Sequence, residues 1–328
     1  MLKSKAEVDL MLKNGTVWLD TEGNPIHAHG GHMLRYGEYW YWYGEDRRGA
    51  SYVSCYRSKN LTDWEYRGAV LSTTSPTAPM RIRSDLSLCR DGIDPNAEIA
   101  ALNVFPAEEG KVNIERPKVL YCARTGKFVM WAHYENGQNY HAASACIATS
   151  DTPDGEFSYH GSFRPYGNMS RDCTLFLDDD GEAYFISNAR DNADLKIYRL
   201  TADFMNVDEE VRTLFQGEHR EAPAMFKHNG KYFLLTSMCT GWLPNQGGYS
   251  VSDAIDGRWS LLENFGDATT FDSQPAFVLP MEDGRYLYVG DRWGGSSESY
   301  FTSTYVILEI RFSDEGMPYI EYCENAAW

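Results

Sequence analysis

The stretch "AMFKHNGKYFLLTS", residues 224–237, contains a short apolar run, a turn with an Asn-Gly pair, and a second run rich in aromatic residues. An Asn-Gly pair between two such runs is a strong signal for a β-hairpin, because both residues tolerate the positive φ of tight hairpin turns. The stretch therefore predicts two antiparallel strands joined at Gly230.

The same pattern recurs at four other places. The copies are "GHMLRYGEYWYWYG" (31–44), "KVLYCARTGKFVMWAHY" (118–134), "CTLFLDDDGEAYFIS" (173–187) and "AFVLPMEDGRYLYVGD" (276–291). A weaker hairpin pattern follows each copy, so each unit should contain four strands. Three of the four intervals between turn glycines are about 50 residues, a period typical of propeller blades. Five units predict an all-β, five-bladed β-propeller. A β-sandwich is the alternative, but it would not explain the regular spacing.

The first interval is longer and holds an insertion at about residues 73–112, between blades one and two. Loops of this length are usually functional or disordered. Its "RDGIDPN", residues 90–96, has the Asp and Asn character of a calcium loop but matches that motif poorly. A structural calcium ion is therefore not supported, and we expect no cofactor. We expect residues 1–328 to form one propeller domain.

Composition limits the function classes. The formal net charge of −17 argues against nucleic acid or an anionic membrane as a partner. The N-terminal "MLKSKAEVDLMLKNG" has no apolar signal-peptide core, and no stretch is long and apolar enough for a membrane helix. Seven cysteines without a CxxC pair favour a reducing compartment. These features predict a cytoplasmic protein; none of them specifies an oligomeric state.

The innermost strand of each propeller blade lines the central channel, so polar residues near its start are the candidates for chemistry. They are His29 and His32, Glu115 and Arg116, Arg171 and Asp172, Arg220 and Glu221, and Gln274. Carboxylates occur at three of these five places. Carboxylates that face each other across a cleft suit glycosidic bond cleavage, in which an acid protonates the leaving oxygen and a base activates water.

Five ordered segments carry a resemblance to glycoside hydrolase family 43, and within it to the exo-β-1,3-galactanase subfamily. They are "HAHGGHML…YWYWYGEDR", "ERPKVLY…TGKFVMWAHY", "SRDCTLFLDDDGEAYFIS", "REAPAMFKHNGKYFLLTS" with the following "CTGW", and "SQPAFVLP" with "YVGDRW". The resemblance spans all five blades and excludes the insertion. It implies an inverting, exo-acting hydrolase that releases galactose from β-1,3-linked galactan or galacto-oligosaccharides, which are neutral substrates.

The resemblance also implies roles for single residues. Glu221 matches the general acid, and Asp172 matches the carboxylate that raises the pKa of that acid and orients it. Glu115 matches a further catalytic carboxylate. Sugar contacts are implied for Glu45, Tyr140 and Thr240. The structural alternatives are a surface turn for Glu45 and an ion pair with Arg171 for Asp172.

Most of family 43 carries a base Asp on the first blade, and "HAHGGH" has none. We expect His29 to line the pocket, and His27 and His32 to pack or to lie behind it. No nearby Cys, Asp or Glu completes a zinc site, so no metal is predicted. The resembling subfamily carries a Gln in the fifth blade, here Gln274. A neutral amide is a poor base, so Gln274 should position the attacking water or act through its imidic acid tautomer. The alternative base is Glu115.

Trp242 in "CTGWLPN" and Trp293 in "GDRWGG" are the expected stacking platforms for sugar rings. Two alternatives to the galactanase function remain open. One is another family 43 activity, α-L-arabinofuranosidase or β-xylosidase. The other is a non-catalytic sugar-binding propeller, which the missing base Asp would suit. Retention of three carboxylates argues against the binder.

Overall fold

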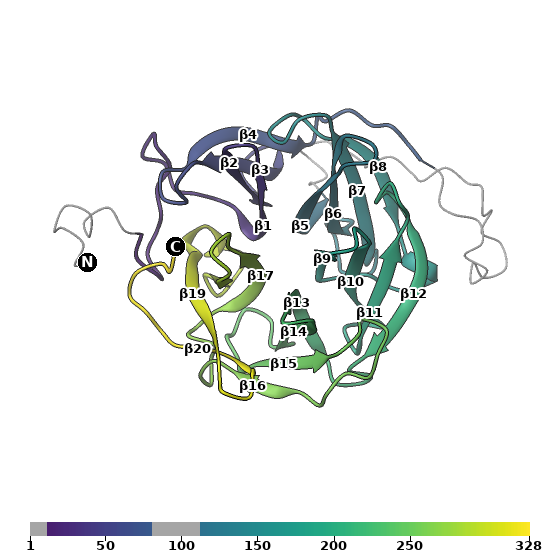
Figure 1. Cartoon of the computed structure of the whole chain (residues 1–328). Helices are drawn as coiled ribbons and strands as arrows, with labels where there is room; N and C mark the ends of the chain where they lie inside the picture. The colour runs from purple at the N-terminus through teal and green to yellow at the C-terminus, as the bar shows by residue number, and fades with distance from the viewer. Residues whose placement is uncertain (1–11, 81–111) are drawn as a thin grey trace.

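The computed structural model describes residues 12–80 and 112–328. Within these residues, five four-stranded antiparallel sheets are each built from four strands that are consecutive in the sequence. Figure 1 shows the sheets arranged around a central axis, with the first strand of each sheet closest to that axis. The predicted all-β, five-bladed propeller is therefore confirmed.

The strands have the following bounds. The first blade contains β1 (His29–Tyr36), β2 (Tyr39–Glu45), β3 (Ser51–Ser58) and β4 (Glu65–Ser72). The second contains β5 (Asn113–Cys122), β6 (Lys127–Glu135), β7 (Ser144–Ser150) and β8 (Ser158–Phe163). The third contains β9 (Cys173–Leu177), β10 (Ala183–Ala189), β11 (Asp194–Leu200) and β12 (Val207–Leu214). The fourth contains β13 (Arg220–His228), β14 (Lys231–Met238), β15 (Gly247–Ser252) and β16 (Glu263–Phe265). The fifth contains β17 (Gln274–Pro280), β18 (Tyr286–Arg292), β19 (Thr304–Phe312) and β20 (Pro318–Ile320).

The hairpin turns lie where the sequence predicted them. Gly230 joins β13 to β14 with a φ of 77°, and Asn229 before it also has a positive φ, 48°. The other four turn glycines likewise have positive φ, which residues with a side chain rarely adopt. The turn glycines therefore determine where the first hairpin of every blade turns.

The ring closes through the segment that precedes β1. The backbone N–H of Gly15 donates to the carbonyl oxygen of Tyr305 at 2.8 Å, and Lys13 forms a β-bridge with Asn325. The Asn14 side chain donates to the Ile307 carbonyl at 3.1 Å and accepts from the Ile307 N–H at 2.8 Å. The N-terminal segment is thus bound to the fifth blade, although every blade keeps its own four strands.

Large aromatic side chains fill the space between blades. Trp42 is 1% exposed and packs on Trp18, Trp64 and Tyr305 between the first and fifth blades. Trp40 is buried in the same cluster. Both tryptophans of "YWYWYG" are therefore core residues rather than sugar platforms.

Part of the predicted insertion lies within the described residues. Residues 76–80 run beside β8, where Ala78 N–H donates to the Tyr159 carbonyl at 2.7 Å and Tyr159 N–H donates to the Pro76 carbonyl at 2.8 Å. The remainder, 81–111, with its "RDGIDPN" loop, lies outside the described residues.

Helical structure in the described ranges is limited to two short 3₁₀ turns, η1 (Pro165–Gly167) and η2 (Tyr300–Thr302). Neither these turns nor any other part of 12–80 and 112–328 supplies a helix with the length and apolarity of a membrane span.

Candidate active site

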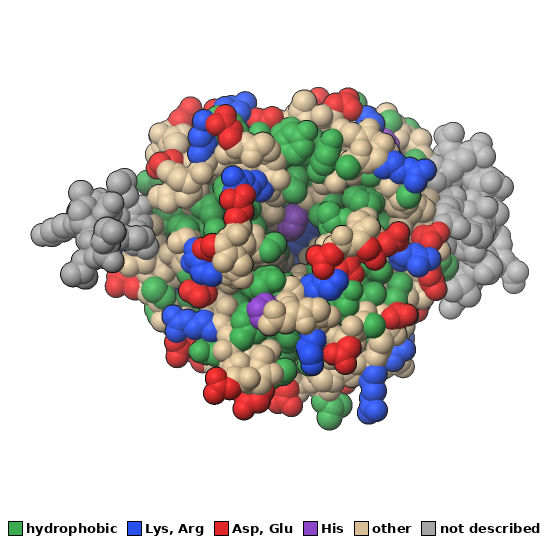
Figure 2. Space-filling view, viewed as in Figure 1, with side chains coloured by type: hydrophobic (Ala, Val, Ile, Leu, Met, Phe, Trp, Pro, Cys, Tyr) green, Lys and Arg blue, Asp and Glu red, His purple; other side chains and the backbone are tan. Residues whose placement is uncertain are grey.

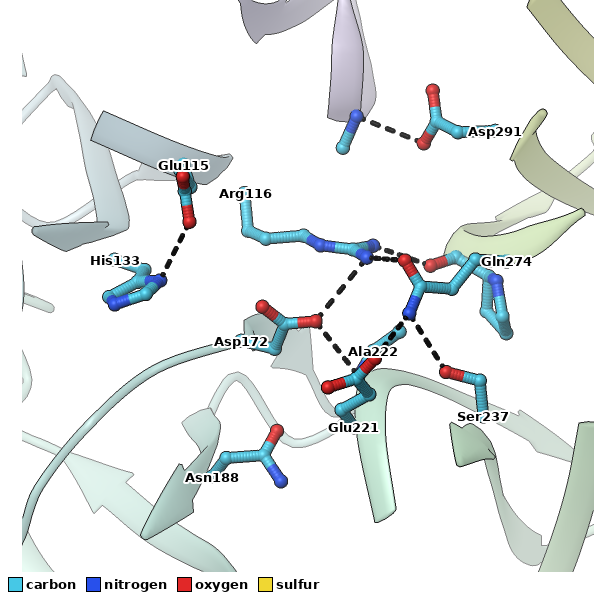
Figure 3. Close-up of polar contacts among 12 residues, drawn as sticks. Glu115, Arg116, His133, Asp172, Asn188, Glu221, Ala222, Ser237, Gln274 and Asp291 are labelled. Carbon is cyan, nitrogen blue, oxygen red and sulfur yellow. Dashed lines mark hydrogen bonds and ion pairs between the residues drawn. The ribbon is translucent and has the colours of Figure 1, made fainter. Parts of the chain in front are cut away.

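The starts of the inner strands meet at one mouth of the channel. Glu115, Glu221 and Gln274 lie near the first residues of β5, β13 and β17, and Asp172 directly precedes β9. Figure 3 shows their side chains converging from separate blades. A cavity of about 300 Å³ lies among them. Its lining includes eight of the ten predicted site residues: Glu45, Glu115, Tyr140, Asp172, Glu221, Trp242, Gln274 and Trp293.

A β-bulge follows the site position in several inner strands. In β1, β5 and β13, the residue after His29, Glu115 and Glu221 has a positive φ: Gly30 at 56°, Arg116 at 54° and Ala222 at 53°. The pairing register shifts at the same points. Bulges redirect side chains at the ends of strands and are enriched beside active sites. The same β-bulge, repeated in three blades, therefore sets the direction of these side chains.

Glu221 has the properties of an acid that keeps its proton near neutral pH. Burial and the nearby negative charge of Asp172 raise the pKa of Glu221 to about 7. Asp172 is held in place because its Oδ2 accepts the N–H of Ala222 at 3.2 Å and lies 3.3 Å from the Arg116 guanidinium. The Asn192 amide contacts the second oxygen of Glu221 at 3.4 Å.

All hydrogen-bonding positions of the Gln274 amide are occupied. Its oxygen accepts from the Arg116 guanidinium and from the Trp293 indole N–H at 2.8 Å. Its nitrogen donates to Glu221 at 2.9 Å and to the Ser237 hydroxyl at 3.0 Å. These partners fix which amide atom is oxygen and which is nitrogen, because Arg116 and Trp293 can only donate.

Glu115 is surrounded by donors. Its Oε1 accepts from Arg47 at 2.9 Å and from the Tyr140 hydroxyl at 2.7 Å, while Oε2 lies 3.3 Å from Nδ1 of His133. Burial alone would raise the pKa of Glu115, but His133, Arg47 and Tyr140 together lower it to about 2. Glu115 is therefore an ionised carboxylate, in contrast to Glu221.

Glu45 forms the wall beside Glu115. Burial raises the pKa of Glu45, and the nearby Arg47 opposes that shift. Arg47 contacts both carboxylates, at 3.2 Å for Glu45 and 2.9 Å for Glu115, and stacks on the Tyr300 ring with its guanidinium carbon 4.4 Å from the ring centroid. Arg47 thus pairs with two carboxylates of the site.

Two of the predicted contacts lie elsewhere. The His29 side chain is fully buried and lies behind the cavity wall, where its Nδ1 is 3.2 Å from Asp291 and its ring stacks on Tyr305. The bulge at Gly30 separates His29 from the regular strand. Thr240 uses its hydroxyl within its own loop, donating to Leu243 at 2.6 Å, while Gly241 and Trp242 reach the cavity.

The glycine pair of "HAHGGH" serves packing within the chain. A Cβ on Gly31 would lie 2.1 Å from the Tyr43 carbonyl oxygen, and one on Gly30 would lie 2.8 Å from Oε1 of Glu45. Across 12–80 and 112–328, no three His, Cys, Asp or Glu side chains are grouped as a metal site would require.

Several functional positions escaped the sequence analysis. Arg116 was among the candidates but was given no role, yet it links Gln274 to Asp172. His133, Glu135, Asn192 and Asp291 lie at the ends of second strands or in loops, and each resembles an ordinary strand-end polar residue. The alternation in "MWAHYE", residues 130–135, places His133 and Glu135 on one face and was the available signal.

The opposite mouth of the channel has a different character. Its cavity of about 490 Å³ is lined mainly by apolar side chains such as Met33, Leu175 and Val278. Its acidic groups are ion-paired, Glu282 with Arg35 at 2.6 Å and Asp179 with Lys227 at 3.0 Å. Figure 2, a view along the ring axis, shows hydrophobic side chains around a central hollow. The facing carboxylates needed for glycoside cleavage lie at the other mouth, with Glu115 and Glu221.

Comparisons with known proteins agree with this geometry. The sequence profile of "Glycosyl hydrolases family 43" matches residues 117–266. An exo-β-1,3-galactanase from Clostridium thermocellum is 45% identical with a TM-score of 0.82, and the match covers 95% of this chain and 65% of that chain. A family 43 β-1,3-galactosidase solved with galactodeoxynojirimycin is 32% identical with a TM-score of 0.82, over 97% of this chain and 100% of that one.

An exo-β-1,3-galactanase from Phanerochaete chrysosporium, solved with β-1,3-galactotriose, is 34% identical with a TM-score of 0.80; the match covers 96% of this chain and 67% of that chain. No curated protein sequence matches the chain. The predicted family is confirmed by the profile and by these structures: the chain belongs to glycoside hydrolase family 43, and it is a glycoside hydrolase.

Proposed function

We propose that this protein is an inverting, exo-acting hydrolase that releases galactose from β-1,3-linked galactan or galacto-oligosaccharides. The observation that carries the proposal is the contrast between two carboxyl groups in one cavity. Glu221 has a pKa of about 7 and Glu115 a pKa of about 2, so near pH 6 one holds a proton and the other is ionised. Such a division of protonation states is what acid-assisted glycoside cleavage requires.

The reaction follows from these states. Glu221 gives its proton to the glycosidic oxygen as the bond from that oxygen to the anomeric carbon breaks. A water molecule attacks the anomeric carbon from the opposite face, which inverts the configuration, and its proton passes to the ionised carboxylate of Glu115. The charge of Glu115 also opposes the positive charge that develops on the sugar ring, and we assign Gln274 to the orientation of Glu221, to which its amide nitrogen donates. Asp172 orients Glu221 and raises its proton affinity.

The cavity suits a neutral substrate. Its carboxylates face three guanidinium groups, those of Arg47, Arg116 and Arg171, so the lining carries little net charge. Trp242 and Trp293 lie edge to face at the rim, with ring centroids 5.6 Å apart, and offer apolar faces to sugar C–H groups. The volume of about 300 Å³ is at the small end of ligand pockets, which favours binding of a terminal sugar. The galactose and the β-1,3 linkage are carried over from the relatives named above.

The test is a proton NMR time course with β-1,3-galactobiose and a short β-1,3-galactan. Wild type should release α-galactose first, and Glu221→Gln should reduce turnover by about 10²- to 10⁴-fold, the usual contribution of general acid catalysis. Glu218→Gln, the same change on an exposed residue of the preceding loop, is the matched control and should retain activity. Release of arabinose or xylose from the corresponding glycosides without galactose release would instead support another family 43 activity. Binding by calorimetry with no product from any glycoside would support the sugar-binding propeller.

A further inference from the structure

His133 lies directly behind Glu115. The two residues are cross-strand partners in the β5–β6 pair, so their side chains share one face of the sheet. The His133 side chain is 1% exposed, and its Nδ1 lies 3.3 Å from Oε2 of Glu115. Figure 3 shows the imidazole pointing at the carboxylate from the side of the second blade. The Glu115 carboxylate thus meets a buried ring on the side away from Arg47.

Glu135 completes a line of three groups. It is two residues beyond His133 on β6 and therefore on the same face. Its Oε1 lies 2.9 Å from Nε2 of His133, and its side chain is 0% exposed. The other oxygen, Oε2, is buried without a hydrogen-bond partner in the described structure. The nearest guanidinium nitrogen, Nε of Arg171, is 3.9 Å from Oε1.

Burial of the Glu135 carboxylate would destabilise the fold if the residue had a purely structural role. Burying a carboxylate costs several kcal/mol unless a partner charge and hydrogen bonds compensate. The partner of Glu135 at hydrogen-bond distance is His133, at 2.9 Å, and its ion pair with Arg171 is longer, at 3.9 Å. The placement becomes favourable when the histidine is an imidazolium, which donates from both ring nitrogens. A neutral imidazole could donate to only one of the two carboxylates.

The groups around His133 also favour its protonated form. Glu115 approaches from β5 and Glu135 from β6 itself, while the Tyr140 ring lies 6.0 Å from the imidazole centroid. Arg47 and Arg171 lie beyond the two carboxylates. Burial lowers the pKa of His133, but the contacts with Glu115 and Glu135 outweigh burial and raise it to about 9.

We propose that Glu135 and His133 are positioning residues: Glu135 keeps His133 cationic, and the cation keeps Glu115 ionised and aimed into the cavity. The inference rests on the proposed function, because it gives Glu115 its charge in that reaction. Neither residue transfers a proton to substrate. Their effect on turnover passes entirely through Glu115.

The experiment uses Glu135→Gln in the full chain. Glutamine keeps an oxygen that can accept from Nε2 of His133 but removes the charge. Proton NMR of the histidine rings, with His133 assigned by comparison with His133→Asn, should show wild-type His133 protonated up to about pH 9. In Glu135→Gln the midpoint should fall by about two units, so that only about a tenth of His133 stays protonated at pH 8. At pH 8 kcat should then fall by about tenfold with little change in KM, and at pH 5, where His133 regains its proton, kcat should return toward the wild-type value.

A structural role would not give this pH-dependent recovery. Equal loss of kcat at pH 5 and pH 8, or an unchanged His133 midpoint in Glu135→Gln, would overturn the proposal. His133→Asn keeps a donor near the position of Nδ1 without a titratable group, so its lower kcat should persist at both pH values. His160→Asn, also in the second blade, is the control for folding and should behave as wild type. If wild type releases no galactose, the proposed function fails, while the NMR midpoints still report whether Glu135 holds His133 as a cation.

Discussion

The amide nitrogen of Gln274 donates a hydrogen bond of 2.9 Å to Oε1 of Glu221, which ties the fifth blade directly to the fourth at the centre of the site. The amide oxygen is occupied as well, by Arg116 and Trp293. In this arrangement Gln274 has no unoccupied lone pair with which to accept a proton from water. An imidic acid form would place an O–H against two groups that can only donate. The network therefore favours Gln274 as the residue that orients Glu221, with Glu115 as the ionised group nearby.

Removing Gln274 and neutralising Glu115 should separate these roles. We expect Glu115→Gln to lower kcat by about 10²-fold or more, because it removes the ionised carboxylate, and Gln274→Ala to lower it by a smaller factor. Turnover of β-1,3-galactobiose measures both. Gln216→Ala, on an exposed residue of another loop, is the control. If Gln274→Ala is as inactive as Glu221→Gln while Glu115→Gln keeps much of its activity, the base belongs to Gln274 and this assignment is wrong.

The pH dependence of kcat/KM should show the effect of Asp172 on the pKa of Glu221. Activity requires protonated Glu221, so the wild-type rate should fall as pH rises through about 7. The negative charge of Asp172 is one cause of that raised pKa, so Asp172→Asn should move the upper limb of kcat/KM to lower pH by about one unit. Asp253→Asn is the control: it removes a charge from a side chain that is 89% exposed, and the pH at which kcat/KM falls should stay unchanged. An upper limb that stays near pH 7 in Asp172→Asn would show that burial alone sets the pKa of Glu221.

Glu221 should also reduce stability at high pH. Its pKa in the folded protein, about 7, lies above the ordinary value of 4.5, so the folded state binds more protons than the unfolded state between these values. The free energy of unfolding therefore falls as pH rises through this window. Glu221→Gln should raise the free energy of unfolding by about 3 kcal/mol at pH 8 and have little effect at pH 4. Urea unfolding at the two pH values measures the difference, and an equal effect at both would contradict the assigned pKa.

The sequence by itself determined the blades. Repeated apolar runs and turn glycines such as Gly230 act over a few residues, so hairpin positions could be read locally and five copies gave the propeller. The site carboxylates Glu115, Asp172 and Glu221 could also be located, because each lies at the equivalent start of an inner strand. Gln274 was located by the same position, but only the family resemblance gave it a role, because its neutral side chain carries no chemical signal of its own.

Only the tertiary structure decided how these groups act. Whether a carboxyl group keeps or loses its proton depends on charges from other blades: Asp172 raises the pKa of Glu221, whereas His133 and Arg47 lower that of Glu115. The bulge at Gly30 sends His29 behind the cavity wall, although the sequence pattern favoured the cavity. Electrostatic interactions and bulge geometry depend on separations in space, and residues such as Arg116 and Gln274 are brought together only when the ring closes.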